Sequence, residues 1–204
     1  MSDHYYSQKP HSELKTEKIH CTIRNQPFIF TTGSGVFSKK GIDFGTRQLI
    51  ETFEEPSVNG PFLDLGCGYG PIGITLAKTF QHRNIVMVDI NERAISLAKE
   101  NVQQNQIENV KIFQSDGFEN IKETEFAAII TNPPIRTGKK NVYGMLQLSA
   151  EHLREEGELW VVIQKKQGAP SMVTFLNTLF PIVEIKNRKK GYHIIRAVKK
   201  QQLT

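Results

Sequence analysis

The sequence has few of the cysteines, histidine motifs and long apolar runs that are typical of disulfide-bonded, zinc-binding or membrane-spanning proteins. Its only cysteines are Cys21 and Cys67, which form no Cys-x-x-Cys pair. This excludes a disulfide framework or a zinc module and fits a reducing cytosol. The six histidines show neither ligand spacing nor a His-Glu-x-x-His motif, so no metal is expected. Without the apolar core of a signal peptide or an apolar run of membrane-spanning length, the chain is expected to be cytoplasmic and to enter no membrane.

Acidic residues are fewer than basic ones. Lys and Arg number 26 against 21 Asp and Glu, a formal charge of +5, while 38% of the residues are apolar and 23% charged. This balance is typical of a globular chain and permits a polyanionic partner. Basic residues crowd the last fifth of the chain, at Lys165, Lys166, Lys186, Arg188, Lys189, Lys190, Arg196, Lys199 and Lys200. Such a cluster either binds a polyanion or is a solvated face that only aids solubility.

The length suits one domain, so we expect a flexible N-terminus over 1–16 and a single domain over 17–204. Two short apolar stretches around Asn25-Gln26 predict an N-terminal hairpin, and Asp43 is placed to cap a helix. From residue 61 onward, strands alternate with helices. Strands are predicted at 61–66, 84–90, 110–116, 126–132, 158–164, 182–188 and 192–199, and helices at 71–80, 91–105, 142–157 and 169–180.

This alternation predicts an α/β fold, a Rossmann-like doubly wound sheet of seven mostly parallel strands with helices on both faces. The last strand is expected to be antiparallel, because residues 189–191 are too short for a crossover connection. Ligands of such sheets bind at the carboxyl ends of the strands.

A glycine-rich loop follows the first of these strands. Residues 63–73 read LDLGCGYGPIG, with Asp64 ahead of Gly66, Gly68 and Gly70. Glycines between a strand and a helix let the backbone turn tightly and approach a ligand. The spacing Gly68-x-Gly70-x-x-Gly73 matches the dinucleotide fingerprint, so NAD has to be considered. The full pattern, Asp-x-Gly-x-Gly-x-Gly, resembles motif I of the class I S-adenosylmethionine methyltransferases, whose loop wraps the amino-acid end of the cofactor.

Two acidic residues end the next two predicted strands. Asp89 lies 19 residues after Gly70, where a carboxylate can accept hydrogen bonds from both ribose hydroxyls of an adenosine. The alternative role for Asp89 is to cap the following helix, which Asn91 could do instead. Asp116 precedes Gly117, and resemblance to the methyltransferase fold implies that this acid binds the adenine amino group.

The strand predicted at 126–132 ends in Asn132-Pro133-Pro134. Proline has no N–H and fixes its φ angle, so the segment is stiff. It resembles motif IV of the S-adenosylmethionine enzymes that methylate exocyclic or amide nitrogens. Such an NH₂ is a weak nucleophile because its lone pair is delocalised. The Asn132 side-chain oxygen and the Pro133 carbonyl would accept its hydrogens and hold the lone pair towards the methyl group. The alternative is a plain strand terminator.

Residues 35–50, GVFSKKGIDFGTRQLI, and the closing GYHIIRAVK are similar to the small-subunit (16S) ribosomal RNA guanine-N2 methyltransferases. The resemblance implies methyl transfer from S-adenosylmethionine to N2 of a guanine, with ribosomal RNA or the small ribosomal subunit as partner. It implies a catalytic role for Asn132, Pro133 and Pro134, and a place near cofactor and substrate for Phe37. It implies cofactor binding by Asp64, Gly66, Gly68, Gly70, Asp89, Asp116 and Gly117.

Two features depart from that family. Ile135 stands where an aromatic residue often stacks on a flipped base, so it would pack against the base while another ring stacks. The candidate rings are Phe37, Tyr143 and Tyr192. The best-known relatives also carry an additional N-terminal domain, which makes Lys189 and Lys190 candidates for phosphate contacts on this domain's own surface.

Three other functions stay open. The same Asn-Pro-Pro would serve an N-methyltransferase acting on a protein glutamine or on an adenine. A non-catalytic module that binds S-adenosylmethionine or RNA is a second possibility. An NAD oxidoreductase is the third, although no hydride-transfer constellation is visible. The oligomeric state is left open.

Overall fold

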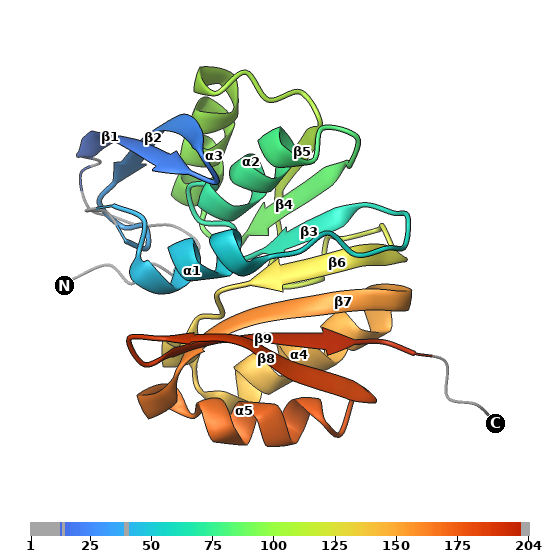
Figure 1. The fold of residues 1–204 in the computed structure, drawn as a ribbon. Coiled ribbons are helices and arrows are strands. Elements are labelled where there is room, and N and C mark those ends of the chain that lie inside the picture. The colour runs from blue at the N-terminus through green and yellow to red at the C-terminus, as the bar shows by residue number, and fades with distance from the viewer. Residues whose placement is uncertain (1–12, 14, 39–40, 201–204) are drawn as a thin grey trace.

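The computed structural model describes residue 13 and residues 15–38 and 41–200 (Figure 1). A seven-stranded sheet runs through the molecule in the order β5-β4-β3-β6-β7-β9-β8. Its strands are β3 (Phe62–Leu65), β4 (Ile85–Asp89), β5 (Val110–Gln114), β6 (Phe126–Thr131), β7 (Leu153–Gln164), β8 (Ile182–Lys189) and β9 (Tyr192–Val198). The pairs from β5 to β7 are parallel, and β9 is antiparallel to both β7 and β8. The predicted doubly wound sheet and its antiparallel last strand are confirmed.

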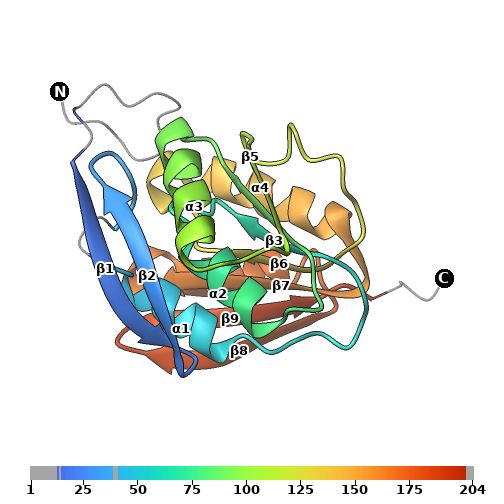
Figure 2. The same ribbon diagram turned by 90° about the horizontal axis from the view of Figure 1, so that it is seen from above.

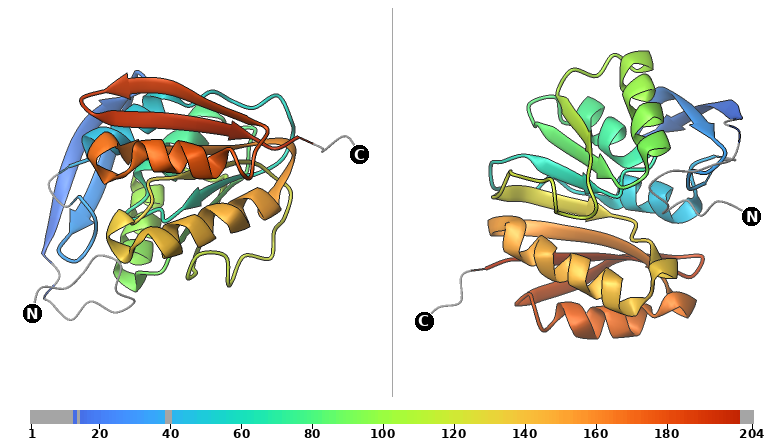
Figure 3. Two further views of the ribbon diagram at one scale, coloured as in Figure 1. Left: turned by 90° about the horizontal axis from the view of Figure 1, so that it is seen from below. Right: turned by 180° about the vertical axis from the view of Figure 1, so that it is seen from behind.

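Helices cover both faces of the sheet (Figures 1 and 3). On one face lie α1 (Phe44–Thr52), α2 (Pro71–Thr79) and α3 (Glu92–Gln104), and on the other lie α4 (Lys139–His152) and α5 (Ala169–Leu176). Alternate residues of each strand point into the two cores on opposite faces of the sheet. Trp160 packs with Phe53 on the side of α1, while Val161 lies in the core on the side of α4 and α5. Fully buried strands with apolar residues on both faces explain the nearly continuous apolar runs of β3 and β6.

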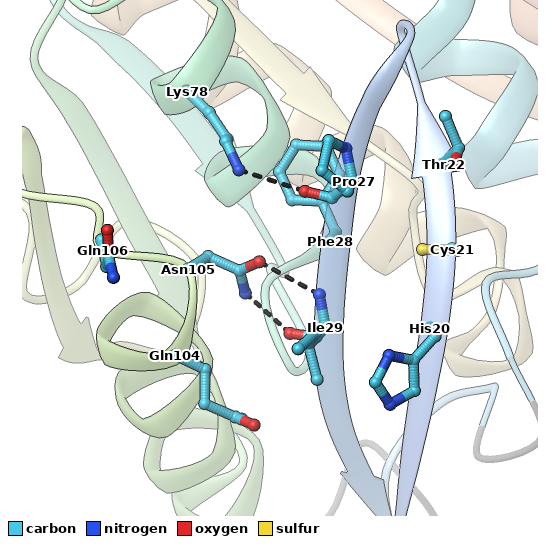
Figure 4. Close-up of a pocket in the computed structure, with 10 residues that line it drawn as sticks. All are labelled: His20, Cys21, Thr22, Pro27, Phe28, Ile29, Lys78, Gln104, Asn105 and Gln106. Atoms are coloured by element: carbon cyan, nitrogen blue, oxygen red, sulfur yellow. Dashed lines mark hydrogen bonds between the residues drawn. The ribbon is translucent and has the colours of Figure 1, made fainter.

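The predicted N-terminal hairpin is present as β1 (Thr16–Ile23) and β2 (Gln26–Gly33) (Figure 2). Arg24 and Asn25 both have positive φ, as a two-residue hairpin turn requires. The free edge of β2 is covered by α3, where the Asn105 side chain accepts from Ile29 N at 3.1 Å and donates to Ile29 O at 2.7 Å (Figure 4). An open groove of about 650 Å³ lies there, between the hairpin and α2 and α3. The flexible segment expected over 1–16 lies almost wholly outside the described residues.

The helix predicted over 142–157 ends earlier than expected. α4 stops at His152, and β7 begins at Leu153, which is buried and pairs with Phe126. Gly157 therefore lies within a strand, where a Cβ would come 2.8 Å from the Phe126 carbonyl oxygen. The glycine marks a strand irregularity, with Glu156 at φ 62°, and its interpretation as a helix stop was wrong.

Candidate active site

All four predicted motifs lie at the edge of the sheet where the parallel strands end, on the left in Figure 1. The strand order places the glycine loop between the ends of β4 and β6. The amino end of α1 and the turn between β8 and β9 reach the same edge: the Lys190 ammonium lies 4.9 Å from the centre of the Phe44 ring. We call this edge, with its loops, the catalytic edge.

The glycines of the loop differ in what surrounds them. Gly66 (φ +77°) and Gly68 (φ +57°) have left-handed backbones, and a Cβ on either would meet nothing within 4 Å. Open space above a turned backbone is what a closely held ligand needs. A Cβ on Gly70 would instead meet Ile74 at 2.7 Å, and one on Gly73 would meet Met87 at 2.6 Å. Gly70 also has a left-handed backbone, with φ +98°, and Gly73 is required for the close packing of α2 on β4.

Asp64 lies beneath this loop and is 1% exposed. Its Oδ2 accepts a hydrogen bond from Gly73 N at 2.8 Å, while Oδ1 is buried with no partner among the described residues. Burial, with a smaller contribution from the nearby Asp89 charge, raises the pKa of the Asp64 carboxyl to about 7, although the Gly73 N–H opposes the rise. A buried carboxylate oxygen with unused acceptor capacity beside an open glycine loop fits the ammonium group of S-adenosylmethionine.

Asp89 holds the loop from the end of β4. Its Oδ2 accepts from Gly68 N at 2.8 Å and its Oδ1 from Asn91 N at 2.9 Å. Burial raises the pKa of the Asp89 carboxyl, although these backbone N–H groups act in the opposite direction. The cap of α3 is Asn91, whose side chain accepts from Arg93 N and Ala94 N. Asp89 is therefore not the cap, and its predicted contact with a ribose stays a prediction.

The loop after β5 carries the third acidic residue. Asp116 is exposed, and Gly117 has φ +52° with open space where a Cβ would lie. The Ser115 hydroxyl donates to Gly117 O at 2.9 Å and accepts from Asn120 N at 3.0 Å, which fixes the loop. The residues predicted to contact the adenine, Asp116 and Gly117, therefore lie at the catalytic edge, two strands away from the glycine loop.

Asn132 follows β6, whose last residue, Thr131, donates its hydroxyl to Leu65 O on β3 at 2.8 Å. The half-buried Asn132 amide donates through Nδ2 to Thr46 Oγ1 at 2.9 Å and, more weakly, to Asp43 Oδ2 at 3.4 Å. Both partners belong to the start of α1. Sequence reasoning identified Asp43 only as a helix cap, which it is, and missed both contacts because nothing local links residues almost ninety positions apart.

The two prolines shape the turn that follows. The Pro133 carbonyl already accepts one hydrogen bond, from Ile135 N at 2.8 Å, across Pro134 at φ −75° and ψ 76°. A carbonyl oxygen has two lone pairs, so one remains for another donor. The Pro134 carbonyl accepts from Thr137 N and from the Thr137 hydroxyl and so builds the short helix η1 (Ile135–Thr137).

The candidate rings have different surroundings. Tyr143 stacks on Phe175, with ring centroids 4.0 Å apart, and Tyr192 packs against Phe44 at 5.6 Å. Ile135 packs partly into the core on the side of α4. Phe37 is 41% exposed. Of the three rings, Phe37 therefore has the most surface available to a base.

Of the nine basic residues that crowd the last fifth of the chain, all but Lys200 fall into two groups. Arg196 pairs with Glu158 and Glu184, Lys186 pairs with Glu54, and the Lys199 ammonium donates to the Leu153 carbonyl, all away from the catalytic edge. The other group lies at the ends of β6 and β7 and in the β8–β9 turn, where Gln164 pairs with Tyr192. We call it the basic rim: Arg136, Lys139, Lys140, Lys165, Lys166, Arg188, Lys189 and Lys190, all exposed. Its first three members were missed, although they directly follow Asn-Pro-Pro-Ile.

Within the described ranges there is no cluster of three or more His, Cys, Asp or Glu side chains arranged to hold a metal ion. No helix in those ranges is long and apolar enough to cross a membrane.

Known proteins are similar to this chain in sequence and in fold. The model of the methyltransferase small domain matches residues 27–196. The uncharacterized protein YbxB of Bacillus subtilis (strain 168) is 56% identical over 98% of this chain and 100% of its own length. Ribosomal RNA small subunit methyltransferase C of Haemophilus influenzae (strain PittEE) is 35% identical over 76% of this chain and 47% of that enzyme.

Among solved structures, the fold matches the Thermus thermophilus 16S rRNA N2 methyltransferase RsmC, in complex with AdoMet and guanosine. The TM-score is 0.81 at 23% identity, over 94% of this chain and 52% of that one. The chain thus spans the whole of YbxB but about half the length of the ribosomal RNA methyltransferases it matches.

Proposed function

The chain belongs to the methyltransferase small domain family and is a methyltransferase with S-adenosylmethionine as cofactor; on that premise we propose that it methylates the exocyclic N2 of a guanine in ribosomal RNA. The observation that carries the proposal is the Asn132 amide. Its nitrogen is engaged by α1, so its oxygen is left to accept from a substrate NH₂ beside the open glycine loop. The substrate class is taken from the relatives, which are ribosomal RNA methyltransferases.

Bound S-adenosylmethionine supplies an electrophilic methyl group on its sulfonium sulfur. Asn132 Oδ1 and the free lone pair of the Pro133 carbonyl accept the two hydrogens of the guanine NH₂. These bonds would hold the nitrogen pyramidal, with its lone pair towards the methyl group of the bound cofactor. The nitrogen would take the methyl group, with the cofactor sulfur leaving as a neutral thioether, and would then lose one hydrogen to solvent as a proton. Asp64 would hold the amino-acid end of the cofactor, and Asp89 and Asp116 would hold its adenosine.

We assign the basic rim to the phosphates of the RNA. Its eight side chains lie at the ends of β6 and β7 and in the β8–β9 turn, and three of them follow Asn132 within eight residues. Phosphate contacts position a nucleic acid and release counterions, so the affinity falls with salt in proportion to the number of contacts. The methylated guanine has to leave its stack to reach Asn132, and Phe37 offers a ring for it.

Reversing two charges of the basic rim is expected to weaken RNA binding. Lys189→Glu together with Lys190→Glu should lower the affinity for ribosomal RNA about tenfold or more. The slope of log affinity against log salt should also become less steep, by the amount expected for the loss of about two phosphate contacts. Fluorescence anisotropy over a salt series measures both. The control is Lys99→Glu with Lys200→Glu, the same change at two exposed positions outside the rim. Equal losses of RNA affinity in both double variants would mean that the rim acts only through the net charge of the protein and makes no specific phosphate contacts.

Transfer of labelled methyl groups to purified substrates tests the proposal against its rivals. Small-subunit ribosomal RNA, the assembled subunit, ribosomal proteins and adenine-containing DNA are offered in parallel, and the label is traced to a nucleoside or an amino acid. We expect N2-methylguanosine. Label found only in glutamine or adenine would replace the proposed substrate with one of the alternatives.

A further inference from the structure

The start of α1 holds the Asn132 side chain in one orientation. Asp43 caps the helix with one carboxylate oxygen, Oδ1, which accepts from Gly45 N at 2.9 Å and Thr46 N at 3.2 Å. Its second oxygen, Oδ2, is 3.4 Å from Asn132 Nδ2, and Thr46 Oγ1 is 2.9 Å from the same nitrogen. Thr46 is buried, with 4% of its surface exposed. Two neighbouring positions of one helix thus converge on one amide group.

The chemistry of these partners decides which way the amide faces. A threonine hydroxyl can donate or accept, so Thr46 alone would tolerate either amide orientation. An ionised carboxylate only accepts, so Asp43 excludes the orientation that would bring Asn132 Oδ1 against it. Nδ2 therefore points to α1, and Oδ1, which accepts no hydrogen bond from the described residues, points to the other side. The nearby negative charge also polarises the amide and makes Oδ1 a stronger acceptor.

The start of α1 is itself packed in place. A Cβ on Gly45 would lie 2.5 Å from the Tyr192 ring, so glycine permits the close approach of α1 to β9. The Phe44 ring packs against the Tyr192 ring and also lies 4.9 Å from the Lys190 ammonium. The helix end that orients Asn132 is thereby fixed to the β8–β9 turn, which carries part of the basic rim.

We propose that Asp43 and Thr46 are positioning residues that aim Asn132 Oδ1 at the substrate nitrogen. This rests on the proposed role of Asn132 in N-methyl transfer, whichever nitrogen is methylated. Loss of either partner leaves the amide free to rotate about χ2, so the acceptor is aimed correctly only part of the time. A small misorientation of a catalytic group lowers the rate of the chemical step while leaving cofactor binding unchanged.

Three variants separate orientation from folding. Thr46→Val keeps the shape but removes the hydroxyl, and we expect kcat to fall about tenfold or more with the S-adenosylmethionine affinity unchanged. Thr46→Ser restores the hydroxyl and should recover most of kcat. Asp43→Asn keeps a good helix cap but puts an NH₂ or a neutral oxygen against Asn132, so kcat should fall without a matching fall in Tm. In an Asn132→Ala background, Thr46→Val should have no further effect.

A readout without substrate keeps this inference separate from the proposed function. In the complex with S-adenosylhomocysteine, ¹⁵N NMR follows the side-chain NH₂ of Asn132. We expect slow hydrogen exchange and a distinct shift in the unmodified chain and in Thr46→Ser, and faster exchange in Thr46→Val and Asp43→Asn.

Unchanged NH₂ signals in both deleterious variants would overturn the inference, as would lower Tm with unchanged kcat. Changed signals in a protein that methylates no ribosomal RNA would support the positioning role while contradicting the proposed substrate.

Discussion

Asn132→Ala is expected to reduce methyl transfer to a small residual rate while leaving cofactor affinity nearly intact. In the proposed mechanism the Asn132 oxygen acts only on the substrate NH₂, so its removal would take away an acceptor that matters most in the transition state. Loss of one such preorganised group costs about 100-fold to 1000-fold in kcat. Single-turnover transfer measures the rate of the chemical step, and calorimetry measures binding of S-adenosylmethionine.

The matched control is Asn141→Ala, at an exposed position near the start of α4 that lies close to the Asn-Pro-Pro turn in sequence. It should keep kcat within about twofold, because it removes no acceptor from the reacting nitrogen. If Asn132→Ala retained ordinary turnover, the Asn-Pro-Pro segment would be a strand terminator and no more.

The second large effect concerns Asp64 and is expected to appear as a pH dependence of cofactor binding. The pKa of this buried carboxyl is raised to about 7 in the free protein, and an ammonium group placed against Oδ1 would lower it. Binding therefore releases a proton where Asp64 is protonated in the free protein. Below about pH 6 the affinity should fall about tenfold per pH unit. Calorimetry in buffers of different ionisation enthalpy counts the released protons.

Asp64→Asn tests the assignment to this residue. The new side chain can still accept from Gly73 N, but it presents an NH₂ where the carboxylate oxygen faced the cation. Affinity at pH 8 should fall about 100-fold, and the tenfold fall per unit below about pH 6 should disappear. An unchanged pH profile in this variant would assign the titration to another group.

The same substitution is expected to stabilise the free protein at pH 8. The folded-state pKa of Asp64 lies above its unfolded value, so the contribution of this group to stability is full at low pH and is lost as the pH rises through about 7. Asp64→Asn removes the charge that opposes folding at pH 8, so the gain in Tm should be larger at pH 8 than at pH 5. A residue that weakens the free fold but strengthens cofactor binding is typical of a functional site.

Much of the fold follows from local pattern. The alternation of short apolar runs with amphipathic segments predicted the sheet and its helices, and the helix caps Asp43 and Asn91 were identified from residue type and position. The one clear error, the end of α4, arose because glycine serves both as a helix stop and as a residue that permits close strand contact. The pairing of Leu153 with Phe126 makes this segment a strand and not the end of a helix, and the two residues are far apart in the sequence.

The site was predictable in its parts but not in its arrangement. The motifs name Asp64, the glycines and Asn132, because each has a local signature between a strand and a loop. The contact of Asn132 with Thr46 joins segments 86 residues apart and depends on how α1 packs. The division of the basic residues depends on which acid lies opposite each one, as Glu158 does for Arg196. Neither follows from spacing along the chain.

Mass spectrometry of ribosomal RNA from cells with and without the gene tests the proposed substrate. We expect one N2-methylguanosine of the small-subunit RNA to be missing when the gene is deleted, to return with the unmodified chain and not to return with Asn132→Ala. A full set of N2-methylguanosines in the deletion strain, with a methyl group lost instead from a protein glutamine or an adenine, would contradict it.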